Sequence, residues 1–278
     1  GCSDMGTGCD TILAQMAADG LGCDMDNIIV RGVDTDQSPY DSGSYASSTT
    51  YVTGGAVVKA CESMRKRICE EAAAIMGLKS GEVDFDGETI SENDNPEHSM
   101  TLSDLITSLE AGNGRIIEVT ESHTSPVSPP PFMAGAAEIE VDLETGKITP
   151  INYVAAVDCG TVINTNLARI QTEGGIVQGM GMTLYEDVQY TEAGKMKNRN
   201  FMSYKIPTRL DMGSISVEFE SSYEQTGPYG AKSIGEIVIN TPAPAIADAV
   251  YNATGLRFRT LPITAEQVMM GLLEREEA

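Results

Sequence analysis

Residues 158–181 read DCGTVINTNLARIQTEGGIVQGMG, and this stretch combines a helical apolar pattern with several glycines. Gly174, Gly175, Gly179 and Gly181 fall inside the pattern, and each glycine costs a helix about 1 kcal/mol relative to alanine. A helix that keeps them needs close backbone approach, either to a neighbouring element or to a ligand. Packing against a protein element is the more common reason for such glycines, but the sequence alone does not choose between an element and a ligand.

The chain on either side alternates between strand and helix signals. The predicted strands are 27–33, 136–143, 147–157, 183–190, 196–204 and 214–220, and the second and third flank a Glu144-Thr145-Gly146 turn. The first predicted helix is capped by Asp10 and ended by Gly20 and Gly22, and the second runs along 57–75 and stops at Gly77. The third runs from Pro244 to Gly255, and the last begins at a Thr264–Gln267 capping box. Because hairpins outnumber clean βαβ repeats, the pattern predicts an α+β fold.

Two breaks divide this pattern. Residues 81–97 carry seven carboxylates and no Lys or Arg, which is typical of a solvated loop or hairpin. Pro129-Pro130-Pro131 forms a stiff extended connector. We therefore expect two mixed sub-domains, with a soft boundary near residue 125.

Charge and composition exclude several classes of protein. The chain has 278 residues and a formal net charge of −23, which argues against binding to nucleic acid or to an anionic membrane, because both require a basic face. No stretch approaches the roughly 20 apolar residues of a spanning helix. The two histidines are scattered and near the surface by this prediction, which argues against a histidine metal cluster.

Six cysteines show neither C-x-x-C spacing nor the density of a disulfide scaffold, so we expect reduced thiols and a cytoplasmic location. The chain runs from Gly1 directly into the glycine turn Gly6-Thr7-Gly8, without a preceding strand. We therefore expect a fragment of something longer.

Three further glycine-rich or hydroxyl-rich segments adjoin apolar elements: 4–11, 42–50 and 227–239. The first leads into a helix N-terminus, whose free N–H groups suit a phosphate, although plain capping is the commoner reason for such a turn. The second offers neutral hydroxyl donors and acceptors to a polar ligand, or simply caps its helix.

The third segment carries one carboxylate, Glu236, followed by Ile237, Val238 and Ile239. Apolar surroundings disfavour the charged form of a carboxylate and make it a stronger proton acceptor. Alternatively, Lys232 lies four residues earlier and pairs with Glu236 on a surface turn. Spacing alone does not choose between the two.

In this order, DMGTGCDT (4–11), DTDQSPYDSGSYASSTTYVTGGAV (34–57), DCGTVINTN (158–166), QTEGGIVQGMG (171–181) and GPYGAKSIGE (227–236) resemble one known family. The resemblance is to the C-terminal half of the molybdenum-binding subunit of the xanthine dehydrogenase and aldehyde oxidase family. It covers nearly all of residues 1–278 and implies a molybdopterin-binding domain of that type.

The resemblance implies a molybdenum cofactor with molybdopterin, with the cytosine dinucleotide form as one option. Its implied contacts are Gly6, Thr7, Ala46, Ser47, Thr49 and Gln171, with Ala46 near the metal, and no metal ligand comes from this chain. Glu236 matches the family's general base in the oxidative hydroxylation of an electron-poor carbon of an N-heterocycle or aldehyde.

One position departs from the family pattern, since Thr7 stands where the family commonly has Gln and cannot offer an amide to the pterin. The implied partners are the N-terminal half of the subunit, iron–sulfur and FAD domains or subunits, and a small-molecule substrate, within an oligomer. The alternative is a non-catalytic assembly subunit that keeps the fold without the cofactor.

Overall fold

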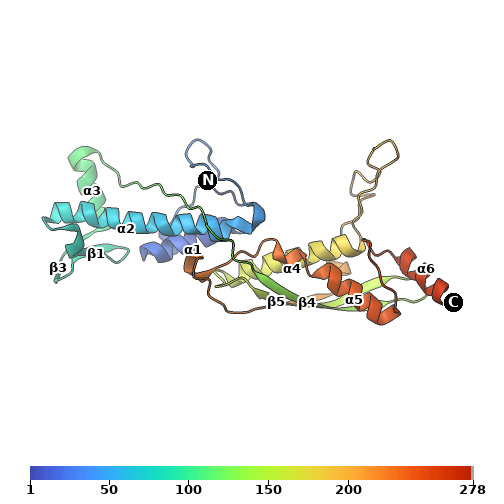
Figure 1. The fold of residues 1–278 in the computed structure, drawn as a ribbon. Helices are drawn as coiled ribbons and strands as arrows, with labels where there is room; N and C mark the ends of the chain where they lie inside the picture. Colours follow the sequence, from blue (N-terminus) through green and yellow to red (C-terminus); the bar gives the residue numbers. More distant parts are fainter. Residues whose placement is uncertain (277–278) are drawn as a thin grey trace. The chain divides into compact units, whose positions relative to one another are not determined.

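A computed structural model describes residues 1–276, apart from the side chains of residues 113 and 276, and divides the chain into two compact units (Figure 1). Unit 1 comprises Gly1–Pro129 and the short segment Gln225–Ala231. Unit 2 comprises Pro130–Glu224 and Lys232–Ala278. The main division falls inside the proline run of the sequence. Each unit combines helices with a three-stranded sheet, which confirms the predicted α+β class.

Unit 1 is built from helices and a small antiparallel sheet in the order β1-β2-β3. Its elements are α1 (Cys9–Leu21), η1 (Met25–Asn27), η2 (Tyr45–Ser47), η3 (Thr49–Thr53), α2 (Gly54–Met76), η4 (Ser80–Glu82), β1 (Val83–Phe85), β2 (Thr89–Glu92), β3 (Asn95–Thr101), α3 (Leu102–Asn113) and η6 (Pro228–Gly230). The long helix α2 ends where predicted, because Gly77 adopts the left-handed conformation at φ 72°.

The acidic segment 81–97 forms hairpins, as one of its two predicted forms, and it also contributes to a hydrophobic core. Val83, Phe85 and Ile90 are buried against Ile68 of α2 and Leu105 of α3. The carboxylates are exposed apart from the half-buried Glu92, and Asp84 approaches Arg65 at 3.6 Å. In β1, apolar and acidic residues therefore alternate, so that one face packs on the core and the other meets solvent.

Two local predictions in unit 1 are wrong. Asp10 does not cap α1, because the helix begins at Cys9 after a left-handed Gly8. The predicted strand 27–33 does not form, because Asn27 belongs to η1 and residues 28–33 are irregular, with Ile29 80% exposed. Residues 28–33 pair with no other strand among the described residues, and β-branched residues do not hold an extended strand without such a partner.

Unit 2 contains the predicted hairpin and one parallel crossover. Its elements are β4 (Phe132–Val141), β5 (Ile148–Asp158), α4 (Thr165–Leu184), η5 (Arg209–Asp211), β6 (Ser214–Phe219), η7 (Ile237–Ile239), α5 (Pro242–Thr254) and α6 (Ala265–Glu276). The strands β4 and β5 are antiparallel, whereas β5 and β6 are parallel and α4 connects them along the chain. The sheet thus includes a βαβ unit that the sequence pattern did not predict.

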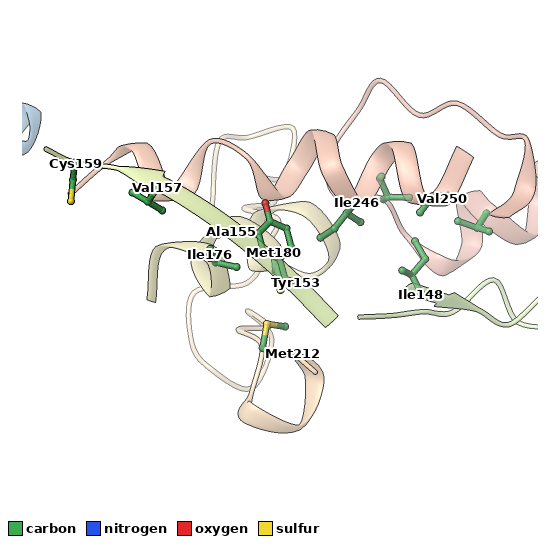
Figure 2. Close-up of a cluster of buried hydrophobic side chains, with 12 residues drawn as sticks. Ile148, Tyr153, Ala155, Val157, Cys159, Ile176, Met180, Met212, Ile246 and Val250 are labelled. Atoms are coloured by element: carbon green, nitrogen blue, oxygen red, sulfur yellow. The ribbon is translucent and has the colours of Figure 1, made fainter. Parts of the chain in front are cut away.

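Figure 2 shows the core of unit 2 along β5. Tyr153, Ala155 and Val157 alternate along the strand and are completely buried, as expected when one face of a strand is covered. They pack with Ile176 of α4 and Ile246 of α5. The strand β5 is therefore the central element of this unit.

Close neighbours account for three of the four glycines in α4, and at Gly181 these neighbours are the Glu186 carboxylate and Pro207. A Cβ at Gly175 would overlap the side chain of Val238, and one at Gly179 would crowd Pro242. By contrast, a Cβ at Gly174 would meet nothing within 4 Å. The neighbour that needs the close approach is the segment around η7, which decides in favour of a protein element at Gly175 and Gly179.

The predicted hairpin of 183–190 and 196–204 is wrong in most of its length. Thr183 is buried within α4 and donates to the Gly179 carbonyl oxygen at 2.6 Å, so the helix continues to Leu184. A single bridge between Tyr190 and Met196 remains around the turn. The predicted Thr264–Gln267 capping box is confirmed, with reciprocal hydrogen bonds of 3.0 and 3.2 Å.

Within residues 1–276, none of the helices combines the length and the apolar character that crossing a bilayer requires.

Replacing Gly175 by alanine tests the glycine packing. We expect Gly175→Ala to lower the free energy of unfolding by about 1–3 kcal/mol, because overpacking forces Val238 or the helix to move. The matched control, Gly174→Ala, should leave stability unchanged or raise it by about 0.5–1 kcal/mol through helix propensity. Urea unfolding of the purified protein measures both, and equal effects would contradict the packing assignment.

Candidate functional site

The predicted site residues fall in both units. Gly6, Thr7, Ala46, Ser47 and Thr49 belong to unit 1, whereas Gln171 and Glu236 belong to unit 2. Within unit 2, the structure brings Gln171 and the residue before Glu236 into direct contact. The candidate site residues therefore form two groups, one in each unit.

The start of α1 already holds a carboxylate of the chain itself. Asp4 Oδ1 accepts the backbone N–H of Gly6 at 2.8 Å and of Gly8 at 3.2 Å, while Oδ2 accepts that of Asp10 at 3.3 Å. The Gly6 hydrogen bond is the main cause that holds the pKa of Asp4 below its ordinary value. The anion that this helix terminus attracts is thus Asp4, a role that its Asp-x-Gly spacing could have indicated.

Gly6 and Thr7 are both exposed at this turn, and Gly6 has φ 105°. Because Asp4 occupies the amides of Gly6 and Gly8, the Thr7 hydroxyl is the group in this turn left to face a ligand. The predicted phosphate contact at the helix terminus consequently loses its original physical reason, although Gly6 and Thr7 stay accessible.

Asp4, Cys9 and Asp10 also bring their oxygen and sulfur atoms within 4.8 Å of one another. Burial, together with the neighbouring thiol of Cys2, raises the pKa of Cys9 to about 12, so its metal-binding thiolate form is disfavoured. Because the Asp4 carboxylate also serves the backbone amides, we assign this cluster to the helix start rather than to a metal ion.

The loop that leads into α2 has an unusual backbone. Ala46 and Ser47 both adopt left-handed conformations, at φ 52° and 56°, and Thr49 opens the π-helical turn η3. Non-glycine residues in this region store strain of about 1–3 kcal/mol each, and such strain clusters at functional sites. Ala46 is exposed, while Ser47 and Thr49 are half-buried.

The short segment Gln225–Ala231 is held in unit 1 by two tyrosines. The Tyr229 hydroxyl donates to the Met16 carbonyl oxygen at 3.0 Å, and the Tyr51 and Thr226 hydroxyls lie 2.6 Å apart. Tyr229 itself has a left-handed backbone at φ 54°, and burial raises its pKa to about 12. This anchoring by Tyr51 and Tyr229 was not predicted from the sequence.

In unit 2, the amide of Gln171 donates to the Gly235 carbonyl oxygen at 3.1 Å. Gln171 is half-buried on α4, and Glu236 follows Gly235 directly as the N-cap residue of η7. Two motifs that lie 64 residues apart along the chain therefore meet at the candidate base.

Apolar surroundings, one of the two alternatives for Glu236, are not found, because Glu236 is exposed. Its apolar neighbour in sequence, Val238, is the residue that turns inward and is completely buried. Lys232 is not a surface partner either, since its ammonium lies 2.7 Å from Asp158 Oδ2 and its side chain is only 10% exposed. Lys232, the alternative partner of Glu236, is thus held by Asp158 instead.

The histidines differ from one another. His98 is exposed and lies 2.9 Å from Glu92, as expected for the surface. His123 is half-buried against Gly55, and its Nδ1 is buried with no hydrogen-bond partner among the described residues. Burial lowers the pKa of His123, helped by Lys59. The prediction of a surface position is therefore wrong in part for His123.

Residues 1–213 match the molybdopterin cofactor-binding domain family, which is more than half of the chain. The chain belongs to this family, within the xanthine dehydrogenase and aldehyde oxidase type of molybdenum enzymes. Membership confirms the predicted resemblance and accounts for the motif order that links the two units.

The relatives of this molybdopterin cofactor-binding domain include the probable hypoxanthine oxidase XdhD of Escherichia coli K12, at 33% identity over 98% of this chain and 28% of that protein. A solved structure of quinoline 2-oxidoreductase from Pseudomonas putida 86 matches with a TM-score of 0.82 and 26% identity, over 98% of this chain and 36% of its own. Carbon monoxide dehydrogenase from Oligotropha carboxidovorans shares the fold, with a TM-score of 0.84 at 24% identity over 99% of this chain and 35% of its own. The chain thus spans about a third of such relatives.

Removing the Asp4 carboxylate tests its role at α1. We expect Asp4→Ala to destabilise the start of α1 by about 1 kcal/mol, as for other lost helix caps. Hydrogen exchange at the amides of Gly8–Ile12 measures the effect, with the exposed Asp94→Ala as control.

The pH dependence gives a second readout of the same carboxylate. Because the pKa of Asp4 is lower in the folded protein, its contribution is present above the ordinary value and is lost as pH falls through the folded value. The protection of α1 should therefore fall below about pH 4 in the original protein and change less in Asp4→Ala. The same acid response in both proteins would contradict the assignment.

Proposed function

We propose that this chain is the C-terminal catalytic part of a molybdenum hydroxylase, in which Glu236 acts as the general base. The reaction is the oxidative hydroxylation of an electron-poor carbon in an N-heterocycle or an aldehyde. The observation that carries the proposal is the contact of Gln171 with Gly235, which joins a predicted cofactor residue to the predicted base within one unit.

The cofactor residues fit a pterin with many heteroatoms. Ala46 and Ser47 present a strained, left-handed backbone with little side-chain bulk, and Ser47, Thr49 and Thr7 add neutral hydroxyls. We assign these residues, with Gly6 and the Gln171 amide, to holding the molybdopterin. When bound, the molybdenum cofactor supplies the redox chemistry of the hydroxylation.

The exposed Glu236 carboxylate accepts a proton at its Oε atoms as the oxygen nucleophile attacks the substrate carbon. This role rests on accessibility and position rather than on burial, because Glu236 lies at the surface of the described residues. Gly235 is held by Gln171, and Val238 is buried two residues after the base. The proton acceptor thus projects from a backbone that is fixed on both sides.

We further propose that this chain works together with other parts of a larger enzyme. Since the chain spans 28% of the hypoxanthine oxidase relative, we expect the remainder of the subunit and iron–sulfur and FAD modules as partners, in an oligomer. The cytosine dinucleotide form of the cofactor and a cytoplasmic location are further expectations. The relatives named above point to purines and quinoline-type heterocycles as the first substrates to screen.

A non-catalytic assembly subunit is the alternative. The departure at Thr7 favours it, whereas the intact KSIGE segment and its ties to α4 favour the enzyme.

Replacing Glu236 by glutamine in the assembled enzyme tests the base. We expect Glu236→Gln to lower the rate by about 10²-fold or more at unchanged molybdenum content, because the amide cannot accept the proton. Glu220→Gln, an exposed carboxylate at the end of β6, is the matched control and should keep full activity. Near-normal turnover of Glu236→Gln would remove Glu236 from this role.

Restoring the family residue at position 7 tests the cofactor contact. Because Thr7 is exposed, we expect Thr7→Gln to fold normally and to retain molybdenum at least as well as the original enzyme after prolonged dialysis. Thr11→Gln, an exposed threonine one turn along α1, should leave retention unchanged. A clear loss of molybdenum in Thr7→Gln alone would show that this loop meets the cofactor in another way.

A further inference from the structure

The segment that carries Glu236 is tied to the end of β5 through Lys232. The Lys232 backbone N–H donates to the Cys159 carbonyl oxygen at 2.7 Å, and its ammonium donates to Asp158 Oδ2 at 2.7 Å. The same ammonium lies 5.3 Å from the centre of the Phe132 ring. Lys232, four residues before Glu236, is therefore held through both its backbone and its side chain.

Asp158 is itself held on its other oxygen. Its Oδ1 accepts the Ser222 hydroxyl at 2.5 Å and the Gly160 N–H at 3.0 Å. Burial opposes the ionisation of Asp158, but the Lys232 and Ser222 hydrogen bonds outweigh it and the pKa lies below the ordinary value. The carboxylate is thus charged at neutral pH and hydrogen-bonded at both of its oxygens.

The segment is also held after the base. Val238 is buried against Gly175 of α4, and the buried Tyr153 hydroxyl donates to the Thr241 hydroxyl at 2.8 Å. Anchors therefore stand at positions 232, 235, 238 and 241, while Glu236 between them is exposed. The arrangement fixes the backbone and leaves the carboxylate accessible.

Stability alone does not account for the ion pair. A mostly buried pair of this kind often adds no net stability over apolar residues of similar size, because both groups lose their hydration. What such a pair does provide is a defined geometry. Here it fixes the position of the backbone segment that carries Glu236. We propose that the Asp158–Lys232 ion pair positions Glu236 for proton transfer, so that both are positioning residues for the reaction. This inference rests on the proposed function of Glu236.

A double-mutant cycle in the assembled enzyme tests the inference. Lys232→Met keeps the side-chain stem and removes the ammonium, and we expect it to lower kcat about 10- to 100-fold, since a small misplacement of a catalytic group has effects of this size. KM and molybdenum content should stay within about twofold of the original values, because the pair acts only through the position of the base. In the Glu236→Gln background, the same change should lower kcat less than about twofold further, because residues that act as a unit are not additive.

Two further measurements do not depend on turnover alone. Hydrogen exchange of the amides at 233–240 should accelerate at least about tenfold in Lys232→Met, while the amides of α6 keep their protection. Lys232→Arg keeps the positive charge and should therefore recover most of the lost kcat and most of the lost amide protection at 233–240. The matched control is Lys195→Met, which lies in the exposed turn at 191–195 and should change neither quantity. If Lys232→Met loses its molybdenum, Asp158→Asn takes its place in the cycle. The asparagine Oδ1 can still accept the hydrogen bonds from Ser222 and Gly160.

The outcomes separate this inference from the function on which it rests. Full activity of Glu236→Gln would overturn the proposed function. A large effect of Glu236→Gln with unchanged kcat and exchange in Lys232→Met would overturn the positioning role alone. Equal losses from Lys232→Met with and without Glu236 would also overturn it, because the ion pair would then act independently of the base.

Discussion

The close approach between α4 and the segment at 237–242 is the constraint on which the rest of unit 2 depends. It requires a backbone without a side chain at Gly175, so that Val238 sits completely buried against the helix. A methyl group at that position would force the two elements apart. Because Glu236 lies two residues before Val238, the packing of this glycine also sets where the candidate base emerges.

The two units hold the backbone around their candidate site residues in different ways. In unit 1, strain in the backbone is concentrated at Ala46, Ser47 and Tyr229, while the helix terminus of α1 is neutralised by Asp4. In unit 2, the backbone around Glu236 is held instead by hydrogen bonds and the Asp158–Lys232 ion pair. In each unit, small or exposed groups are therefore accessible on a backbone that is held in place, which is what the proposed function asks of these residues.

Much of the fold could be predicted where the sequence pattern is local. The end of α2 at Gly77, the β4–β5 hairpin and the capping box at Thr264 follow from turn and cap chemistry that a few neighbouring residues determine. The failures lie where a partner was needed. Residues 28–33 have strand composition but pair with no strand among the described residues, and residues 183–184 continue a helix in which Thr183 is completely buried.

The sequence by itself determined the family, the order of the motifs and the candidate residues, because glycines and small polar residues at fixed positions are readable without coordinates. Only the tertiary structure decided which of two roles each residue takes. It paired Lys232 with Asp158, and it exposed Glu236 while burying Val238. Each of these depends on contacts between residues distant in the chain or on the direction of a backbone, and such geometry comes from packing, which spacing along a sequence does not specify.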